Sequence, residues 1–311
     1  MGEETSFRDR LYAWWMAARV HTLPAGISPV LVGIGIAAAD EVFSLWPALA
    51  ALVGAVLIQI GTNFANDYSD AIKGTDAPDR TGFTRVTAAG LLEASTVRLA
   101  AFTTFGLAIL LGTYLVYIGG LPIAIIGLSS VLFGYLYTGG PKPYGYRGLG
   151  DLFVFVYFGL VAVVGTYYVQ AADVLASPLT VAIPAGTITL EAILGGIAMG
   201  ALTTAILVVN NYRDIEEDTA AGKRTLAVML GPRWTRVEFI ALLAVAYLVP
   251  IYFVFEGYEL VLFVYATLPV GAYAIRTMLI IQEGETLNQL LSNVGRLTLL
   301  YAILFAVGVW W

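Results

Sequence analysis

The chain has 311 residues, of which 59% are hydrophobic and 12% are charged, and its net charge is −6 at pH 7. Soluble domains carry roughly 25% charged residues, so this composition excludes an ordinary soluble domain and indicates an integral membrane protein. The chain has no cysteine and one histidine, His21, which excludes disulfides and both cysteine-based and histidine-rich metal sites. No nucleic-acid partner is expected.

Residues 1–18 are predicted to form an amphipathic helix that lies in the membrane interface. They contain acidic residues and no uninterrupted apolar core, so they are not a secretory signal. Apolar residues recur near helical spacing at Phe7, Leu11, Trp14, Trp15 and Ala18, as expected for an interfacial helix. A frayed tail is the alternative for the first six residues.

Nine apolar runs follow, each near the length of about 20 residues with which a helix crosses a bilayer. They are Thr22–Ala39, Trp46–Ala65, Val97–Ile118, Leu121–Tyr137, Leu149–Ala172, Leu190–Val209, Val237–Phe255, Leu260–Ile281 and Gly295–Trp311. The sequence therefore predicts an all-α membrane protein with nine transmembrane helices in a single domain, 1–311.

The basic residues indicate how the chain is oriented. With the N-terminus inside, all 16 Lys and Arg residues fall within or at the edge of the inner segments, which are 1–21, 66–96, 138–148, 210–236 and 276–296. The outer loops contain acidic residues and no Lys or Arg. The positive-inside rule predicts a cytoplasmic N-terminus, with Trp311 outside. This bias alone is the expected reason for Arg233, Arg236 and Arg276.

Two similar acidic motifs lie half a sequence apart. They are NDYSD at 66–70 and NNYRD at 210–214, and aligning them pairs Tyr68 with Tyr212 and Asp70 with Asp214. Four predicted helices separate the motifs, as an internal duplication of a four-helix unit would leave them. We therefore expect two four-helix repeats plus one further helix, with both motifs on the cytoplasmic side.

The spacing of these polar residues favours a metal site. Residues three or four apart share a helix face, which pairs Asn66 with Asp70, Asn63 with Asp67, and Asp214 with Asp218. Carboxylate and amide oxygens suit Mg²⁺, which also binds substrate phosphates, and two such clusters could hold a diphosphate through bridging metals. The alternative is that these residues only cap helix ends, which explains two matched clusters less well than one.

Basic residues surround both motifs. They are Lys73, Arg80 and Arg85 after the first motif, Arg213, Lys223 and Arg224 in or after the second, and Lys142 and Arg147 between predicted helices four and five. Such residues would oppose the binding of a bare metal ion, but they would neutralise a diphosphate directly.

Several segments resemble one family. NDYSDAIKGTD (66–76), YTGGPKPYGYRGLGD (137–151), NNYRDIEEDTAAGKRTLAVMLG (210–231) and RVHTLPAGISPVLVG (19–33) resemble signatures of the UbiA superfamily of intramembrane prenyltransferases. The resemblance spans the whole chain. One departure is that Gly74 occupies the usual place of the third acid of the first motif, and the acid follows at Asp76.

The resemblance implies a fold, an activity and a set of site residues. It implies a UbiA-type bundle in the cell membrane that transfers a polyprenyl group from polyprenyl diphosphate to an aromatic acid. The expected acceptor is 1,4-dihydroxy-2-naphthoate, which would lose its carboxylate and yield demethylmenaquinone. Mg²⁺ is the implied cofactor, bound by Asn66, Asp70, Asp214 and Asp218 with help from Asp67, and these four aspartates are the expected catalytic residues.

The substrates have their own expected residues. Those for the diphosphate are Lys73, Arg80, Arg85, Lys142, Arg147, Lys223 and Arg224. Those for the aromatic substrate are Arg19, His21, Tyr137 and Tyr146. Further candidates are Asn63, Asp76, Asn210, Tyr68 and Tyr212.

Three other functions are alternatives to this one. A transporter would also show repeats, but its charges are expected near the bilayer midplane, whereas these lie at the inner helix ends. Another enzyme of the same superfamily would use a different acceptor. A CDP-alcohol phosphotransferase would show a single long acidic motif that is missing from this sequence.

Overall fold

The computed structural model describes residues 7–74, 82–281 and 284–311, and this part of the chain contains helices and no strands. The α-helices are α1 (Phe7–Ala18), α2 (Leu23–Ala39), α3 (Leu45–Lys73), α4 (Ala94–Leu136), α5 (Gly150–Val154), α6 (Ala162–Leu175), α7 (Leu190–Arg213), α8 (Ile215–Ala220), α9 (Leu226–Phe255), α10 (Leu268–Ile280) and α11 (Gly284–Trp310). The short 3-10 helices are η1 (Val20–Thr22), η2 (Tyr144–Arg147) and η4 (Glu259–Thr267), and η3 (Phe155–Val161) is a π-helix. The predicted all-α class is confirmed.

The number of membrane-spanning helices differs from the prediction at one place. Among the described residues, eight helical stretches are long and apolar enough to cross a membrane, rather than nine. The difference lies in α4, where Gly120 has φ 66° and ψ −150° and interrupts the helix. Gly134 in the second half of α4 lies against Phe105 in the first half, so the two halves fold back on one another. The third and fourth predicted spans are therefore both present, joined at Gly120 between them.

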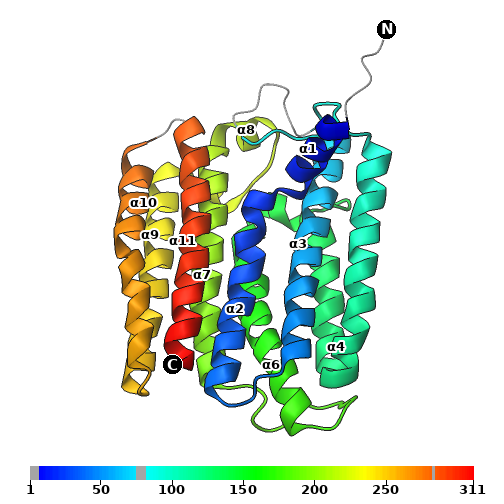
Figure 1. The fold of residues 1–311 in the computed structure, drawn as a ribbon. Coiled ribbons are helices and arrows are strands. Elements are labelled where there is room, and N and C mark those ends of the chain that lie inside the picture. Colours follow the sequence, from blue (N-terminus) through cyan, green and yellow to red (C-terminus); the bar gives the residue numbers. More distant parts are fainter. Residues whose placement is uncertain (1–6, 75–81, 282–283) are drawn as a thin grey trace.

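The long helices stand side by side along one axis, with α1 and α8 at one end of the bundle and the C-terminus at the other (Figure 1). Helix α7 is central, because its residues form one buried cluster with residues of α2, α9, α10 and α11. Glycines allow close contact inside the bundle: a Cβ added at Gly159 would lie 2.4 Å from Cα of Gly200. Small residues at helix contacts are typical of membrane bundles.

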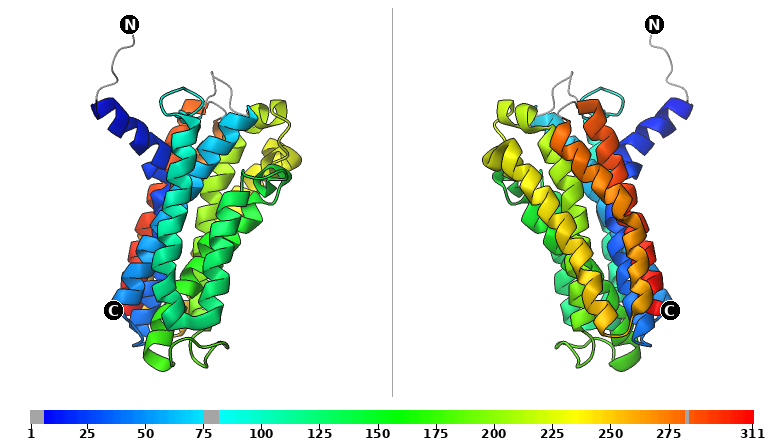
Figure 2. Two further views of the ribbon diagram at one scale, coloured as in Figure 1. Left: turned by 90° about the vertical axis from the view of Figure 1, so that its right-hand side faces the viewer. Right: turned by 90° about the vertical axis from the view of Figure 1, so that its left-hand side faces the viewer.

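Helix α1 leans away from the bundle at the end that carries α8 (Figure 2). The ring of Trp14 packs edge-on against Phe64 of α3, with ring centroids 5.6 Å apart, while Phe7 and Trp15 are exposed. Exposed apolar residues on a short tilted helix suit an interfacial position, which stays a prediction.

Helix α3 is longer than predicted. It continues to Lys73, two turns beyond the expected end at Ala65, so the first acidic motif lies within a helix and not after it. The second motif lies where α7 meets α8. Both motifs therefore lie at the end of the bundle that carries α1 and α8 (Figure 1).

Candidate active site

A cavity of about 640 Å³ lies inside the bundle. Its walls come from α2, α3, α4, η2, η3, α6, α7 and α8, so both halves of the chain contribute. At one end the lining is polar, with Asn66, Asp70, Asp214, Asp218 and Lys223. Towards the other end the lining becomes apolar, with residues such as Leu115, Val116 and Ile123.

The first motif presents two side chains to this cavity. Asn66 and Asp70 are four residues apart on α3 and both line the cavity, as their shared helix face predicts. Thr138 donates a hydrogen bond from its hydroxyl to Oδ1 of Asn66 over 2.7 Å. Asp70 accepts a hydrogen bond from the hydroxyl of Tyr146 on Oδ1 and pairs through Oδ2 with Nη2 of Arg85 at 3.3 Å.

Asp67 and Asn63 have structural partners in this fold. Oδ2 of Asp67 accepts hydrogen bonds from the backbone N–H of Thr87, over 3.0 Å, and from the hydroxyl of the same residue. Asn63 donates to the carbonyl of Ala18 and to Oγ1 of Thr22, over 2.9 and 3.1 Å. Asp67 does not line the cavity, whereas Asn63 does. These contacts hold the segment after α3 and the segment before α2 against the first motif.

The second motif bends around a helix junction. Asp214 ends α7 and precedes α8, and the N–H of Asp218 donates to the carbonyl of Asp214 over 2.7 Å. This bond continues one helical turn, so the two carboxylates lie on one face and both line the cavity. The first predicted metal pair and the second therefore meet in a single cavity.

Arg213, which the sequence predicts only as one of several basic residues near a diphosphate, anchors this motif. Its Nε and Nη2 donate to the two carboxylate oxygens of Asp214 over 2.6 and 2.8 Å. The same guanidinium donates to Oδ1 of Asn210 over 2.9 Å and to Oδ1 of Asn288 on α11 over 2.6 Å. A fork of this kind is a strong, directional contact, and the only sequence signal for it is the position of Arg213 inside the motif.

The predicted diphosphate residues separate into two groups. Arg85 and Lys223 line the cavity, and Nζ of Lys223 lies 3.4 Å from Oδ1 of Asp218. Lys73 lies beside them: its ammonium donates to the carbonyl of Thr138 and is 5.4 Å from the ring centroid of Tyr146. The exposed residues outside the cavity lining are Lys142, Arg147 and Arg224. Arg80 and Asp76 lie outside the described residues.

Arg19 and His21 reach the cavity from the segment between α1 and α2. The ring of His21 lies 4.1 Å, centroid to centroid, from that of Phe83, and the guanidinium carbon of Arg213 lies 5.8 Å from the same Phe83 ring. Phe83 also lines the cavity. This corner combines a flat apolar surface with cations, which suits a planar aromatic acid.

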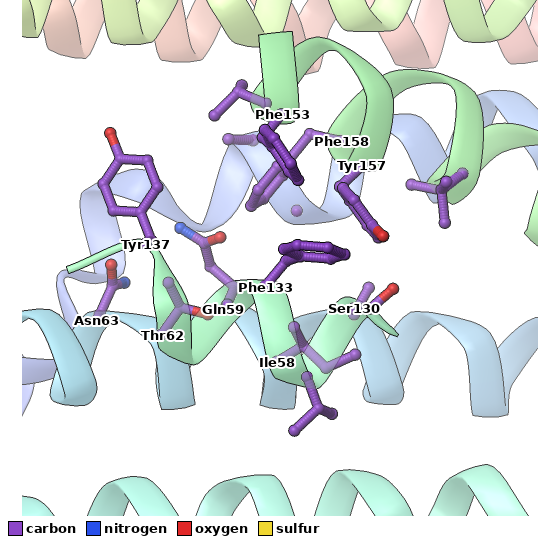
Figure 3. A pocket seen from close by; sticks show the side chains of 18 of the residues that line it. Ile58, Gln59, Thr62, Asn63, Ser130, Phe133, Tyr137, Phe153, Tyr157 and Phe158 are labelled. Carbon is purple, nitrogen blue, oxygen red and sulfur yellow. The ribbon is translucent and has the colours of Figure 1, made fainter. Parts of the chain in front are cut away.

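Five aromatic residues separate the polar end from the apolar end: Phe133, Tyr137, Tyr144, Phe153 and Tyr157. Ring centroids are 4.8 Å apart for Phe133 and Phe153, and 5.4 Å apart for Tyr137 and Tyr144. Figure 3 shows Phe133, Phe153 and Tyr157 close together, with Asn63, Thr62 and Tyr137 beside them. Burial raises the pKa of Tyr144 above its usual value, so its hydroxyl group stays protonated at neutral pH.

Two other predicted tyrosines lie away from the cavity lining. The hydroxyl of Tyr212 accepts a hydrogen bond from Nη2 of Arg236 over 2.6 Å. The ring of Tyr68 lies 5.8 Å from the guanidinium carbon of Arg98 and packs against a separate apolar cluster. Although the motif alignment pairs these two residues, the structure gives them different partners.

The oxygen donors fit Mg²⁺ if a ligand completes its coordination. Asn66, Asp70, Asp214 and Asp218 present amide and carboxylate oxygens to the same cavity. Within the described part of the chain, no three His, Cys, Asp or Glu side chains are close enough to form a metal site alone. Mg²⁺ keeps several waters and commonly takes one or two carboxylates plus substrate phosphates. The residues therefore fit a metal ion shared with a phosphate-bearing substrate.

The bundle and its cavity, polar at one end and apolar towards the other, define a multi-pass membrane protein with an internal cavity of ligand size. The chain belongs to the UbiA prenyltransferase family, which matches residues 26–294, and it is a prenyltransferase. The predicted family is thereby confirmed.

Relatives and a solved structure support this assignment. The chain is 44% identical over 233 residues to the 1,4-dihydroxy-2-naphthoate octaprenyltransferase of Mycobacterium tuberculosis, covering 75% of each chain. It is 34% identical over 320 residues to the enzyme of the same name from Haemophilus influenzae, covering 99% of each. A UbiA homolog from Archaeoglobus fulgidus bound to GPP and Mg²⁺ superposes with a TM-score of 0.60 at 17% identity, covering 96% of this chain and 99% of that one. At this identity the structural likeness concerns the fold.

Proposed function

We propose that this chain transfers a polyprenyl group from polyprenyl diphosphate to 1,4-dihydroxy-2-naphthoate, with Mg²⁺ as cofactor and loss of the acceptor's carboxylate as CO₂. The product would be a demethylmenaquinol, the hydroquinone form, because the reaction itself removes no electrons from the ring. The observation that carries the proposal is the single cavity in which two acidic motifs meet at one end and apolar side chains line the other. The names of the relatives from Mycobacterium tuberculosis and Haemophilus influenzae support the choice of acceptor.

The charged residues are arranged to exchange partners when substrate binds. Without ligand, Asp70 pairs with Arg85, Asp214 with Arg213, and Asp218 with Lys223. A diphosphate at this end would take hydrogen bonds from Arg85 and Lys223, which frees Asp70 and Asp218 for a metal ion. Mg²⁺, when bound, would stabilise the negative charge that develops on the leaving diphosphate. Arg213 would stay with Asp214, because it is also held by Asn210 and Asn288.

The aromatic residues next to this end would protect the reacting carbon. Cleavage of the allylic C–O bond leaves a cation on the first carbon of the prenyl group, and aromatic faces attract cations. Phe133, Tyr144 and Phe153 lie where that carbon would be if the diphosphate occupies the polar end and the tail the apolar end. They would also exclude water, which would otherwise trap the cation. The acceptor would enter beside Arg19, His21 and Phe83, with its carboxylate towards Arg19.

The orientation is part of the proposal. The distribution of Lys and Arg supports a cytoplasmic N-terminus and a site that opens to the cytoplasmic side of the cell membrane. Because the native chain has no cysteine, single cysteines can be introduced and labelled from either side. A Cys at position 85 should react with a membrane-impermeant thiol reagent only from the cytoplasmic side. Labelling only from outside would contradict the orientation.

A product assay tests the activity itself. The purified chain in detergent, supplied with Mg²⁺, octaprenyl diphosphate and 1,4-dihydroxy-2-naphthoate, should yield a prenylated naphthohydroquinone, detectable by mass spectrometry as such or as the quinone after oxidation by air. A panel containing 4-hydroxybenzoate and glycerol phosphate in place of the naphthoate tests the other acceptors. Product with none of these acceptors, in a preparation that stays folded, would contradict the proposed function.

A further inference from the structure

Four glycines from four helical segments border the apolar part of the cavity. They are Gly54 of α3, Gly112 and Gly127 of the two halves of α4, and Gly165 of α6, and we call them the glycine ring. A Cβ added at any of the four would meet no heavy atom within 4 Å. These glycines therefore border open space, and no helix contact requires them.

Other glycines of the same helices behave differently. A Cβ added at Gly61 would lie 2.9 Å from the ring of Phe105, and one at Gly119 would lie 2.4 Å from Ile123. Those glycines serve close packing. Glycine is a poorer helix former than alanine, so the glycine ring has no local reason to be glycine. The remaining role for these positions is to leave space in the cavity.

An apolar cluster shows that the four glycines lie at one depth. One turn from them lie Ala51, Val116, Ile123 and Val169, which all belong to a single packed cluster and all line the cavity. The glycine ring thus lines the apolar part of the cavity at one level, one turn before this cluster. Gly54 lies 16 residues before Asp70 on α3, which corresponds to about 24 Å along the helix at about 1.5 Å per residue.

Beyond this cluster the cavity lining extends to the turn of α4 and the loop after α6. Leu179 and Tyr117 line the cavity there, and the N–H of Leu179 donates to the carbonyl of Tyr117 over 2.9 Å. The N–H of Leu121 likewise donates to the carbonyl of Thr180 over 2.8 Å. The loop after α6 is thereby fixed to the turn of α4 at this end of the cavity.

We propose that the glycine ring sets the length of prenyl tail that the chain accepts. The inference rests on the proposed function, because it needs a diphosphate at the acidic motifs and the prenyl tail in the apolar part of the cavity. A short tail such as geranyl ends before the glycine ring. A long tail such as octaprenyl passes through the ring, and the missing side chains are what leave it room.

Two prenyl diphosphates with tails of different length test the role of the glycine ring. With 1,4-dihydroxy-2-naphthoate as acceptor, kcat/KM is measured for geranyl and for octaprenyl diphosphate. Since a single methylene in an apolar pocket changes discrimination by roughly tenfold or more, Gly112→Leu should lower the octaprenyl-to-geranyl ratio by at least about tenfold. Gly106→Leu is the matched control, because Gly106 lies on the same helix, is exposed, has no atom within 4 Å of an added Cβ and does not line the cavity. Its ratio should equal that of the parent chain.

Smaller changes keep the test decisive if the leucine variant folds poorly. Gly112→Ala, Gly112→Val and Gly127→Ala should lower the ratio in order of added volume. Ratios that stay at the parent value, or equal losses for both tails in every variant, would overturn the role of the glycine ring. A parent chain that prenylates no acceptor with either tail would contradict the proposed function itself, which is a different result from an active parent with unresponsive variants.

Discussion

Tyr146 donates its hydroxyl hydrogen bond to Oδ1 of Asp70, a residue 76 positions earlier in the chain. The contact ties η2, between α4 and α5, to the first acidic motif on α3. The ring of the same tyrosine lies 5.4 Å from Nζ of Lys73 and 4.9 Å from Nζ of Lys223. Tyr146 therefore joins charges from both halves of the chain, in addition to any contact with the aromatic substrate.

Replacement of Tyr146 by phenylalanine should reduce activity without unfolding the chain. The change keeps the ring between the two lysines and removes one hydrogen bond to a carboxylate. Hydrogen bonds to charged groups contribute about 1.5–3 kcal/mol, which corresponds to roughly a tenfold to hundredfold fall in kcat/KM. The loss should appear when prenyl diphosphate is varied at limiting Mg²⁺.

Tyr273→Phe serves as the control, because Tyr273 is exposed on α10. It should keep the parent rate. If Tyr146→Phe instead changes only the KM for the naphthoate, the hydroxyl acts on the acceptor and the hydrogen bond to Asp70 is incidental.

Substitutions of the two carboxylates of the second motif should have the same effect on activity but different effects on stability. Asp218→Asn should abolish turnover with little loss of stability, because the Asp218 and Lys223 side chains are both partly solvent-accessible, at 10% each. Asp214→Asn should abolish turnover and also destabilise the fold. The side chain of Arg213 is 1% exposed, and a buried cation that loses its partner typically costs about 3–5 kcal/mol.

Thermal unfolding in detergent, together with the product assay, checks both expectations. Glu216→Gln is the matched control, since Glu216 is exposed on α8 and does not line the cavity. EDTA should reproduce the loss of turnover in the parent chain, and added Mg²⁺ should restore it. Turnover that survives in both aspartate variants would exclude the second motif from the site.

Local patterns were sufficient to predict the helical spans and the two acidic motifs. Apolar runs mark the spans because the bilayer imposes their length, and the break at Gly120 falls between the third and fourth predicted runs. The partners of the motifs could not be predicted in this way. Thr138 reaches Asn66, and Thr87 reaches Asp67, across 72 and 20 positions, and nothing in a local pattern specifies such pairings.

Local sequence patterns also do not predict which basic residues line the cavity. The sequence places Lys142, Arg147 and Lys223 on one side of the membrane, since the positive-inside rule acts on whole loops. Whether one of these side chains lines a cavity or faces solvent depends on how α8 and η2 fold against α3. Only Lys223 of the three lines the cavity, and no sequence pattern distinguishes it.

Arg236 should matter for stability, although its position in the sequence suggested only a topological role. Its Nε donates to the carbonyl of Met278 over 3.0 Å and its Nη2 to the hydroxyl of Tyr212 over 2.6 Å, so it joins α9 to α10 and α7. Loss of these contacts should cost about 1–3 kcal/mol. Arg233 is exposed, with its guanidinium carbon 5.8 Å from the ring centroid of Trp234, and a cation–π contact at an exposed site contributes about 0.5–1 kcal/mol.

Thermal unfolding of the Arg236→Ala and Arg233→Ala variants compares the contributions of the two side chains to stability. We expect a clearly lower Tm for the first and nearly the parent value for the second, with the relative activity of each folded protein unchanged. Equal Tm values would mean that the contacts of Arg236 contribute nothing measurable to the fold.

The last prediction concerns the basic residues around the cavity. Arg85 and Lys223 line it and face the acidic motifs, whereas Lys142, Arg147 and Arg224 are exposed outside it. If the first group binds diphosphate, each contact is charge-assisted and contributes about 1.5–3 kcal/mol. Lys223→Ala should then lower kcat/KM for prenyl diphosphate by roughly tenfold to a hundredfold, with a much smaller change when the naphthoate is varied. Lys142→Ala should remain near the parent value, because an exposed charge at this distance is screened by water and salt.

Initial rates against both substrates, at low and high ionic strength, distinguish the two groups. Equal losses in Lys142→Ala and Lys223→Ala, or a change confined to the naphthoate, would show that the diphosphate does not bind at the acidic end of the cavity.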